Sequence, residues 1–338
     1  MATLNTNTTI NTASTTALNK TYIDRDLLAF ARTQFKHAKY GQKRNIPPHN
    51  GKVVEFRRWE LFDPNDALGG LTEGVTPAGQ ALGQTTVEAT LKQYGAYVTI
   101  SDLADKTFID DAMDDSVELL GEQIGTVIEW VTRDAMNAGT TVQYTGGKTS
   151  RATLTASDKL TTDDIRKAVR TLKKNKVRWF NGSDGKGRGK HLICICSPDA
   201  TYDLQSDSNW QDVSKYSNAE QIYSGEIGKM FGVVFVESTE AKVWAGAGAT
   251  NGGKKADVHS ALVFGRDAYG TIDIGSSGAI KSIVKGFGSA GTEDPLNQRA
   301  TVGAKVMAYT AKILNDDWIV RIEHGVSDGE TVTEIGGV

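Results

Sequence analysis

Cysteine is scarce in this sequence, with only two in 338 residues. Cys194 and Cys196 stand two positions apart in a stretch that reads as a strand, so their side chains point to the same side. A disulfide between such close neighbours would be strained. A metal site would need further ligands, and His191 is the only one close in sequence. We therefore expect both thiols to be reduced and buried, where free cysteine behaves as a small apolar residue.

Long apolar runs are also absent, because no stretch approaches the ~18 residues that read as a membrane span. Residues 1–20 are rich in Thr, Asn and Ala, and they lack the basic and apolar regions of a secretory signal. The apolar share of 39% and the charged share of 23% are typical of a soluble globular protein. We expect no membrane association, and a protein that is made and kept in a cytoplasm.

The usual signatures of catalysis are missing as well. The histidines form neither an HExxH motif nor a pair at helical spacing; they stand at positions 37, 49, 191, 259 and 324. Residues 145–150 (TGGKTS) resemble the end of a phosphate-binding loop, but Val142 stands where that motif needs glycine. The GAGATNGG stretch at 246–253 lacks the spacing of a dinucleotide site. We expect no enzyme activity, no cofactor and no metal, although dispersed acids can still converge in space.

Charge is unevenly distributed along the chain. The formal net charge is −3, yet residues 20–58 hold ten Lys/Arg against three Asp/Glu, a net of +7. Such a basic segment on an acidic body predicts a polyanionic or acidic partner, or simply a solvated helix face. Residues 166–178 and 186–191 form a second basic cluster, in which aromatic residues follow Arg178. That mixture suits a single-strand binder or an ordinary surface helix, and the acidic balance argues against a dedicated nucleic-acid reader.

The first hundred residues predict a tail, a short helix and a hairpin arm. Residues 1–18 have no periodicity and almost no charge, so we expect them to be disordered or ordered by a partner. Apolar spacing predicts an amphipathic helix over 21–39, which the paired prolines after it end. Strand-like stretches at 51–62 and 85–100 flank a Gly-rich tract. An isolated hairpin is marginal in water, so this arm needs another surface to lie on.

The middle of the chain predicts one long helix and then an α/β subdomain. Between residues 111 and 138 apolar side chains recur every three or four positions, with Asp110 or Asp111 as cap and Gly139 as terminator. From about residue 160 the elements are shorter. They are a helix capped by Thr161 or Thr162, a strand at 191–196 that is apolar on both faces and therefore central, a helix capped by Ser197, and strands at 231–238 and 259–265.

The most strongly patterned stretch, residues 297–325, predicts two long strands. Four side chains share one face of the first strand by alternation; they are Val302, Ala304, Val306 and Ala308. The NDD sequence at 315–317 predicts the turn, and Trp318, Val320 and Ile322 alternate along the partner strand. We expect these two strands to pair with each other. The segment holds no recognisable nucleophile, metal cluster or phosphate loop.

Several phrases resemble one family. They are GKVVEFRRW, LTEGVTP, KQYGAYVTISDL, LLGEQ, RDAMNAGT, YTGGKTSRA, SGEIGKMFGVVFVES, ALVFGRDAYG, SAGTEDPLNQRATVG and ILNDDWIVRIEHG. Over residues 20–325 the chain resembles the major capsid (coat) proteins of tailed bacteriophages, more narrowly the podovirus-type family, whose coat-protein fold herpesvirus shells share. The resemblance implies an α+β fold with an N-terminal arm at 1–49 and an extended hairpin loop at 50–101. It further implies a peripheral domain with a long spine helix at 102–154 and 276–338, and an α/β axial domain at 155–275.

The resemblance also implies a function. Copies of the chain would assemble through pentamers and hexamers into an icosahedral shell around double-stranded DNA, which they would contact non-specifically. Scaffolding protein, portal and possible decoration proteins are the expected partners, with assembly in the host cytoplasm and a final place in the virion capsid. An encapsulin-like bacterial compartment is the alternative, and a DNA-binding protein is the alternative from another class.

The expected contact residues follow from the two basic regions and the arm. For contacts between subunits we expect Arg57, Arg58, Glu73 and Lys92 on the hairpin arm. For a basic arm that faces the interior of the shell we expect Lys36, Lys39, Lys43 and Arg44.

Overall fold

The computed structural model describes residues 36–47, 49, 51–76, 78–107, 112–181, 189–207, 210, 226–251, 254–274, 281–289, 293–327 and 329–332. The expected tail at 1–18, most of the helix expected over 21–39 and residues 186–188 of the second basic cluster lie outside these residues. The described end of that helix, His37–Lys39, is a single 3-10 turn, η1.

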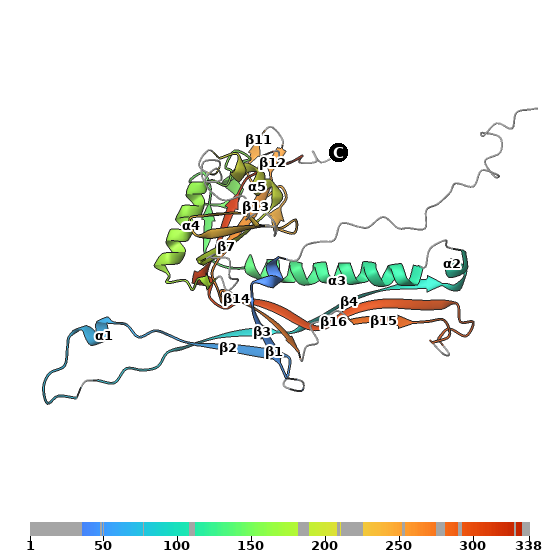
Figure 1. Cartoon of the computed structure of the whole chain (residues 1–338), viewed down its shortest axis with the longest axis horizontal. Helices are drawn as coiled ribbons and strands as arrows, with labels where there is room; N and C mark the ends of the chain where they lie inside the picture. Colours follow the sequence, from blue (N-terminus) through green and yellow to red (C-terminus); the bar gives the residue numbers. More distant parts are fainter. Residues whose placement is uncertain are drawn as a thin grey trace, which may run out of the picture.

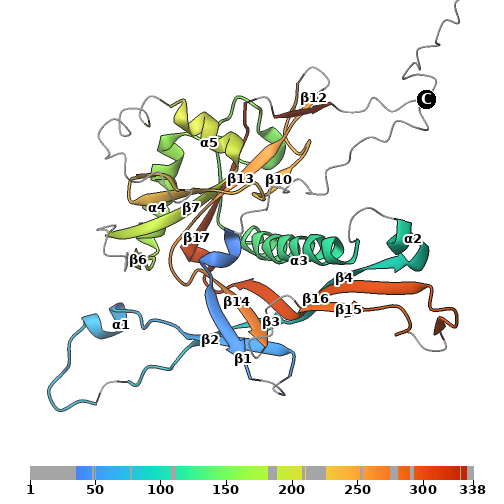
Figure 2. The same cartoon turned by 45° about the vertical axis from the view of Figure 1, so that its right-hand side comes forward.

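A five-stranded sheet and a long helix form the first part of the body (Figures 1 and 2). The sheet has the order β1–β14–β16–β15, and β4 also pairs with β16. Its strands are β1 (Gln42–Ile46), β4 (Lys92–Ser101), β14 (Tyr269–Ile274), β15 (Lys281–Lys285) and β16 (Arg299–Ile313). The helix α3 (Ala112–Met136) lies along one face, and α2 (Asp102–Thr107) follows β4. We call α3 and this sheet the spine unit.

The helix α3 confirms the long helix expected over 111–138. Its apolar stripe, which includes Leu120 and Ile124, packs on the side chains that β4 and β16 turn toward it. Those side chains are Tyr94, Ala96, Ile100, Val302, Ala304, Val306 and Tyr309. At 1.5 Å per residue its 25 residues span roughly 38 Å. One continuous apolar stripe therefore holds β4 and β16, the long strands of the sheet, against the helix.

The second part of the body is an eight-stranded sheet with two helices on one face. Its order is β5–β17–β13–β7–β9–β8, with β10 paired to β13 and β6 to β7. The strands are β5 (Val142–Tyr144), β6 (Phe180–Asn181), β7 (Lys190–Cys196), β8 (Glu226–Met230), β9 (Val233–Glu237), β10 (Val243–Trp244), β13 (Val258–Phe264) and β17 (Ile319–His324). The helices α4 (Thr162–Lys174) and α5 (Pro198–Gln205) pack on one face of it. We call this the two-layer unit.

Local predictions for the two-layer unit hold. The strand β7 is central and buried on both faces, and Cys194 and Cys196 lie side by side in the core as free thiols. Thr161 caps α4 by accepting a hydrogen bond from the Asp164 N–H, and Ser197 caps α5 by accepting one from the Ala200 N–H. These signals depend on neighbours in sequence, which is why the sequence alone carries them.

The expected pairing of the two strands in residues 297–325 is wrong. The strand β16 lies in the five-stranded sheet, whereas β17 pairs with β13 and β5 in the eight-stranded sheet. The NDD sequence forms no hairpin turn but leads into a 3-10 turn, η5 (Asp316–Trp318). The Asp316 carboxylate accepts hydrogen bonds from the Thr140 N–H at 3.0 and 3.1 Å, just beyond the end of α3. This contact lies in the connection through which the chain passes from the five-stranded sheet to the eight-stranded sheet.

A bulge in β16 corrects a second expectation. The pairing of β16 with β4 shifts between Val306 and Tyr309, because one strand has an extra residue there. Tyr309 consequently joins the side chains under α3, while Ala308 turns to the opposite face, against Ile272. The uninterrupted alternation from Val302 to Ala308 therefore ends at Val306.

The hairpin arm projects from the opposite face of the five-stranded sheet. It consists of β2 (Val53–Trp59), β3 (Gln84–Thr90) and the segment between them, which holds α1 (Asn65–Leu68). The expected return strand is split at Leu91, since β3 pairs with β2 but β4 pairs with β16. Ala89 and Leu91 are buried against Ile272 and Ala308 at the base of the arm. A separate small sheet joins β11 (Thr250–Asn251), β12 (Lys254–Ala256) and β18 (Glu330–Val332), and η2 (Arg151–Thr153) follows β5.

Candidate assembly surfaces

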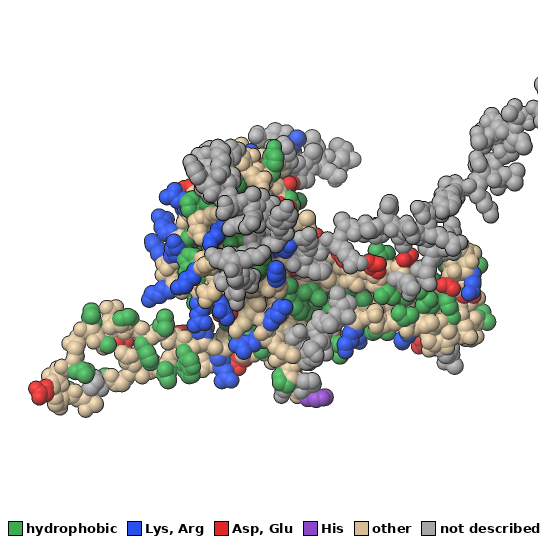
Figure 3. Space-filling model, viewed as in Figure 1, with side chains coloured by type: hydrophobic (Ala, Val, Ile, Leu, Met, Phe, Trp, Pro, Cys, Tyr) green, Lys and Arg blue, Asp and Glu red, His purple; other side chains and the backbone are tan. Residues whose placement is uncertain are grey.

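The tip of the hairpin arm is apolar and exposed. Leu61, Leu68 and Leu71 are 88%, 80% and 82% exposed, and Trp59, Phe62, Val75 and Leu82 are also exposed. Figure 3 shows these apolar side chains along the arm. Acids accompany them, since Glu60, Asp63 and Asp66 line a cavity of about 470 Å³ between the two limbs. Soluble monomers rarely expose contiguous apolar surface, so the arm has the composition of an interface.

The four expected contact residues all lie exposed on this arm or at its base. Arg57 and Arg58 stand together on β2, opposite Thr86 and Thr85. Glu73 lies in a distal turn, and Lys92 opens β4 at the base, so the structure does not bring the four together. None forms an ion pair within the described residues. Their contact with another subunit stays a prediction.

A second exposed surface lies on the far half of the five-stranded sheet. The face turned away from α3 is covered near the arm by its base, around Ala308 and Ile272. Further along, Tyr97, Gly303 and Ile283 form one row across three strands, and Tyr97 is 73% exposed. The same face carries Lys281, Lys285, Lys305 and Met307 by strand alternation. We call this half the open sheet face, because no described element covers it.

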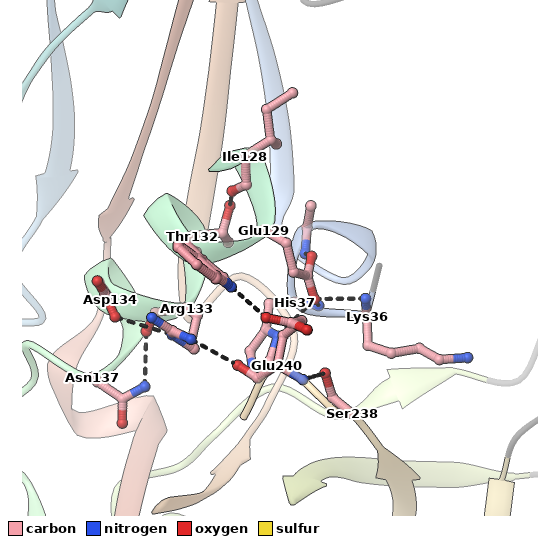
Figure 4. Close-up of polar contacts among 12 residues, drawn as sticks. Lys36, His37, Ile128, Glu129, Thr132, Arg133, Asp134, Asn137, Ser238 and Glu240 are labelled. Atoms are coloured by element: carbon pink, nitrogen blue, oxygen red, sulfur yellow. Dashed lines mark hydrogen bonds and ion pairs between the residues drawn. The ribbon is translucent and has the colours of Figure 1, made fainter. Parts of the chain in front are cut away.

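The N-terminal arm is fixed to α3 by a buried carboxylate (Figure 4). Glu129 is fully buried and accepts hydrogen bonds from the Lys36 N–H at 2.7 Å and the His37 N–H at 2.6 Å. It also accepts one from the Ala38 N–H at 3.2 Å. The His37 Nδ1 lies 2.7 Å from the same carboxylate, which only accepts, so this nitrogen carries the proton. The Tyr269 hydroxyl donates to the His37 carbonyl. We call these contacts the arm clasp.

The clasp keeps its carboxylate charged. Burial acts to raise the pKa of Glu129, but the hydrogen bond and charge of His37, with the backbone N–H groups of His37 and Lys36, outweigh it. The pKa of Glu129 therefore lies below its usual value. A depressed carboxyl pKa stabilises the folded arm above the unfolded pKa, and this stabilisation is lost as pH falls through the folded pKa.

The expected basic arm residues lie in the clasp or just after it in the sequence. Lys36 is half-buried beside Glu129, and Lys39 is exposed with its Nζ 5.5 Å from the Tyr40 ring. Lys43 and Arg44 are exposed on β1, which pairs in parallel with β14. All four lie within one short segment on the spine unit. Sequence reasoning missed Glu129 and His37, because an acid beside the apolar stripe of a helix is usually solvated.

A polar seam joins the end of α3 to the two-layer unit (Figure 4). Trp130 Nε1–H donates to the Glu240 carboxylate, and Arg133 donates to the Glu240 carbonyl at 3.1 Å. The Lys242 ammonium lies 3.1 Å from Asp134. Deeper in the seam, Ser260 donates to the Asn137 side-chain carbonyl at 2.6 Å. Directional contacts of this kind fix the angle between the two units.

Two buried histidines lie side by side in the two-layer unit. His259 and His324 are cross-strand neighbours on β13 and β17, with ring centroids 6.1 Å apart. Burial lowers the pKa of His259, against the charges of Asp199, Asp257 and Asp203. Burial lowers the pKa of His324 to about 4, against its hydrogen bond to the Gly325 carbonyl. Neither position carried a sequence signal.

The depressed pKa of His324 predicts acid sensitivity. The unfolded chain takes up this proton near pH 6.5 and the folded chain near 4, so stability falls as pH drops through that window. The shift corresponds to ~3 kcal/mol of unfolding free energy. His324→Gln should remove that part of the pH dependence, measured by urea unfolding of subunits at pH 7, 5.5 and 4. The exposed His49→Gln is the matched control, and a His324→Gln curve that parallels the wild type would contradict the assignment.

The described residues form neither a Ser-His-Asp triad nor a metal-binding cluster. The Ser197 hydroxyl lies 2.9 Å from His259 Nδ1, but Asp199 approaches that same nitrogen at 3.9 Å, so no charge relay forms. Ser197 is buried and caps α5. No three His, Cys, Asp or Glu side chains gather in a metal-binding arrangement within the described ranges. No helix among them is long and apolar enough to cross a membrane.

Known proteins share this architecture of two packed units and a projecting arm. A sequence model of the phage capsid protein family matches residues 131–287, just under half of the chain. The capsid of cyanophage Pam1 superposes with a TM-score of 0.70 at 14% identity, over 96% of this chain and 100% of that one. The chain has the coat-protein fold of tailed-phage capsids. The resemblance to their major capsid proteins is thereby confirmed, and with it the shell-forming role.

Two further comparisons place the chain within that fold. The capsid of Ralstonia phage GP4 superposes with a TM-score of 0.68 at 15% identity, over 95% of this chain and 98% of that one. The encapsulin SrpI of Synechococcus elongatus superposes less closely, with a TM-score of 0.57 at 10% identity over 95% and 97% of the chains. No curated protein matches the sequence significantly. The family match favours the phage shell over the compartment.

Proposed function

We propose that copies of this capsid protein close into an icosahedral shell, as rings of five and six, around a double-stranded DNA genome. The observation that carries the proposal is the hairpin arm, whose exposed apolar tip contributes nothing to the subunit core. Large buried interfaces between identical chains need such surfaces. An encapsulin-like compartment stays the alternative, because it uses the same fold to enclose protein.

The arm and the open sheet face are proposed to meet in neighbouring copies. The arm extends from one end of the molecule and the open sheet face lies toward the other end (Figure 1). The tip combines Leu61 and Leu68 with Asp63 and Asp66, while the open sheet face combines Tyr97 and Ile283 with lysines. A head-to-tail contact between unlike surfaces closes into a ring when the rotation permits.

Charge reversal tests this contact. Lys281→Glu with Lys285→Glu places like charges opposite the tip, which costs several kcal/mol at an interface, so closed shells should disappear from negative-stain images of the expressed chain. Adding Asp63→Lys and Asp66→Lys in the same chain should restore them. Lys106→Glu with Lys312→Glu is a control with the same charge change elsewhere. Closed shells from the first variant, or no rescue by the second pair, would count against the contact.

The two units are proposed to take the two roles implied by the resemblance. The spine unit corresponds to the peripheral domain, expected at 102–154 and 276–338, and the two-layer unit to the axial domain, expected at 155–275. Three strands depart from the expected bounds. The strands β5 and β17 fall in the ranges expected for the peripheral domain but join the eight-stranded sheet, and β14 falls in the range expected for the axial domain but joins the spine unit.

The remaining proposals concern partners. Lys36, Lys39, Lys43 and Arg44 are proposed to face the interior, where scaffolding protein or DNA phosphates would meet them; rapid tryptic cleavage there in intact particles would refute this. Portal and decoration proteins, and assembly in the host cytoplasm, complete the proposal.

We also propose that the chain has no enzyme activity. A turnover abolished by one point substitution would contradict that.

A further inference from the structure

The exposed face of α4 is strongly basic. Residues 166–178 hold seven Lys or Arg and no acid. The opposite face of α4 is buried in the core, through Ile165, Val169 and Leu172 among others. The cations are therefore turned outward, and Lys and Arg side chains gather along the edge of the molecule where α4 lies (Figure 3). In an otherwise acidic chain this is a concentrated patch of one sign.

Four of these seven cations form no ion pair with a described acid. Arg166 and Lys167 lie 3.7 and 3.0 Å from Asp163, and Arg178 lies 3.7 Å from Asp267. The other four form no ion pair within the described part of the chain; they are Arg170, Lys173, Lys174 and Lys176. The patch therefore keeps free positive charge for a ligand, because its own neighbours neutralise only its ends.

A cavity beside α4 gives the patch a defined shape. It measures about 560 Å³ and is lined by Arg166, Val169, Arg170, Lys173, Lys174 and Phe231. Phe231 lies in the two-residue turn between β8 and β9 with φ +53°, a conformation that a bulky residue rarely adopts. Phe231 is 44% exposed, and the centre of its ring lies 5.6 Å from the Arg166 guanidinium. Gly232 also has positive φ, as two-residue hairpin turns favour, and the turn presents an exposed aromatic side chain beside four cations.

The spacing of the cations suits a phosphate backbone. With a rise of 1.5 Å per residue, Arg170 and Lys174 lie roughly 6 and 12 Å along the axis from Arg166. Each strand of duplex DNA carries one phosphate per about 3.4 Å of helix axis, so a row of long, flexible cationic side chains can reach successive phosphates. These cationic side chains only donate hydrogen bonds, so the row lacks the combination of donors and acceptors that reads base edges. It therefore fits non-specific electrostatic binding, not sequence recognition.

We propose that the exposed face of α4 binds the phosphate backbone of packaged DNA, so that this side of the two-layer unit faces the interior of the shell. This rests on the proposed function, because a shell around protein cargo would present no phosphate backbone. It adds a second DNA-contacting surface, remote in sequence from the basic arm, and it gives the subunit an inside and an outside.

Salt dependence of DNA binding tests the surface itself. The probe is a fluorescent 30-bp duplex, titrated with unassembled full-length chain at 50 and 200 mM NaCl. Each lost phosphate contact lowers the slope of log K against log salt by ~0.9. For each protein, the measured quantity is the factor by which affinity falls between 50 and 200 mM NaCl. In the triple variant Arg170→Gln/Lys173→Gln/Lys174→Gln this factor should be about 40-fold smaller than in the wild type. An unchanged slope would overturn the proposal.

A matched control and a second polyanion make the result specific. Lys106→Gln/Lys254→Gln/Lys312→Gln removes the same charge from exposed positions outside both basic regions and should keep the wild-type slope. An equal loss there would show a general charge effect and overturn the proposal. Thermal melting shows whether both variants are folded. If the α4 variant loses affinity for polyglutamate but not for the duplex, the face belongs to an acidic protein segment instead, and the proposal fails.

Lysine labelling in assembled particles tests the orientation. A bulky amine reagent should leave Lys173 and Lys174 unmodified in DNA-filled particles and modify them once the DNA has been released and the shells opened. Modification in intact filled particles would place α4 outside, and protection in both states would place it against another subunit. Either result overturns the proposal while leaving the shell function intact. Particles that never contain DNA would instead refute the proposed function.

Discussion

Replacing residues 65–82 by a short Gly/Ser turn should leave a folded subunit that no longer closes shells. Every described residue in this range is exposed, so the replacement removes no side chain from the core. Shortening a surface connection changes loop-closure entropy only slightly, by about 1 kcal/mol or less. The interface would lose Leu68, Leu71 and Asp66, whereas Glu60 and Asp63 would remain. We expect cooperative thermal melting close to that of the wild type and only capsomers or irregular sheets by electron microscopy.

A variant of unchanged length separates the chemistry of the tip from its reach. Leu61→Ser, Leu68→Ser and Leu71→Ser together keep the arm long but remove its three most exposed large apolar side chains. If apolar contact with a neighbour drives closure, this variant should also fail to form shells. Normal shells from the shortened arm would show that the tip is dispensable. An insoluble product would show that the arm belongs to the subunit core.

Predictions from local sequence were accurate for the fold, whereas predictions of strand partners were not. The helix α3, the caps Thr161 and Ser197 and the buried strand β7 depend on spacing within a few residues, so the sequence carries them. The alternation in β16 and β17 shows that each strand is half-buried or buried. It carries no information on which strand lies beside it, since any sheet rewards the same period. The Asp316 anchor at Thr140, which redirects the chain, is a long-range contact.

The candidate surfaces show the same limit. The sequence predicted that the arm is exposed and needs a partner, because its Gly-rich tract lacks large apolar residues at core spacing. It did not predict the split at Leu91, which depends on burial against Ile272 from a strand about 180 residues later. Glu129 was similarly hidden. A carboxylate beside an apolar stripe is usually a solvated neighbour, and only its contacts with residues 36–38 show that it is a clasp.

Removing the Glu129 carboxylate should release the N-terminal arm. In Glu129→Ala the N–H groups of Lys36, His37 and Ala38 and the His37 ring would lose their acceptor inside the protein. Removing one partner of a buried charge pair typically costs ~3–5 kcal/mol. Because each ~1.4 kcal/mol is a factor of ten, amide hydrogen exchange in residues 36–46 should accelerate by at least ~100-fold. The global melting transition should move less, since the arm can open while the sheets stay folded.

Two further variants show whether the clasp acts as one unit. His37→Ala added to Glu129→Ala should cost little beyond the first substitution, because partners in one network are not additive. Glu118→Ala, on the exposed side of the same helix, should leave exchange in the arm unchanged. Acid should imitate Glu129→Ala in the wild type, because the carboxylate protonates as pH falls through its depressed pKa. If residues 36–46 stay protected in Glu129→Ala, the pairing of β1 with β14 holds the arm by itself, and the carboxylate is not the clasp.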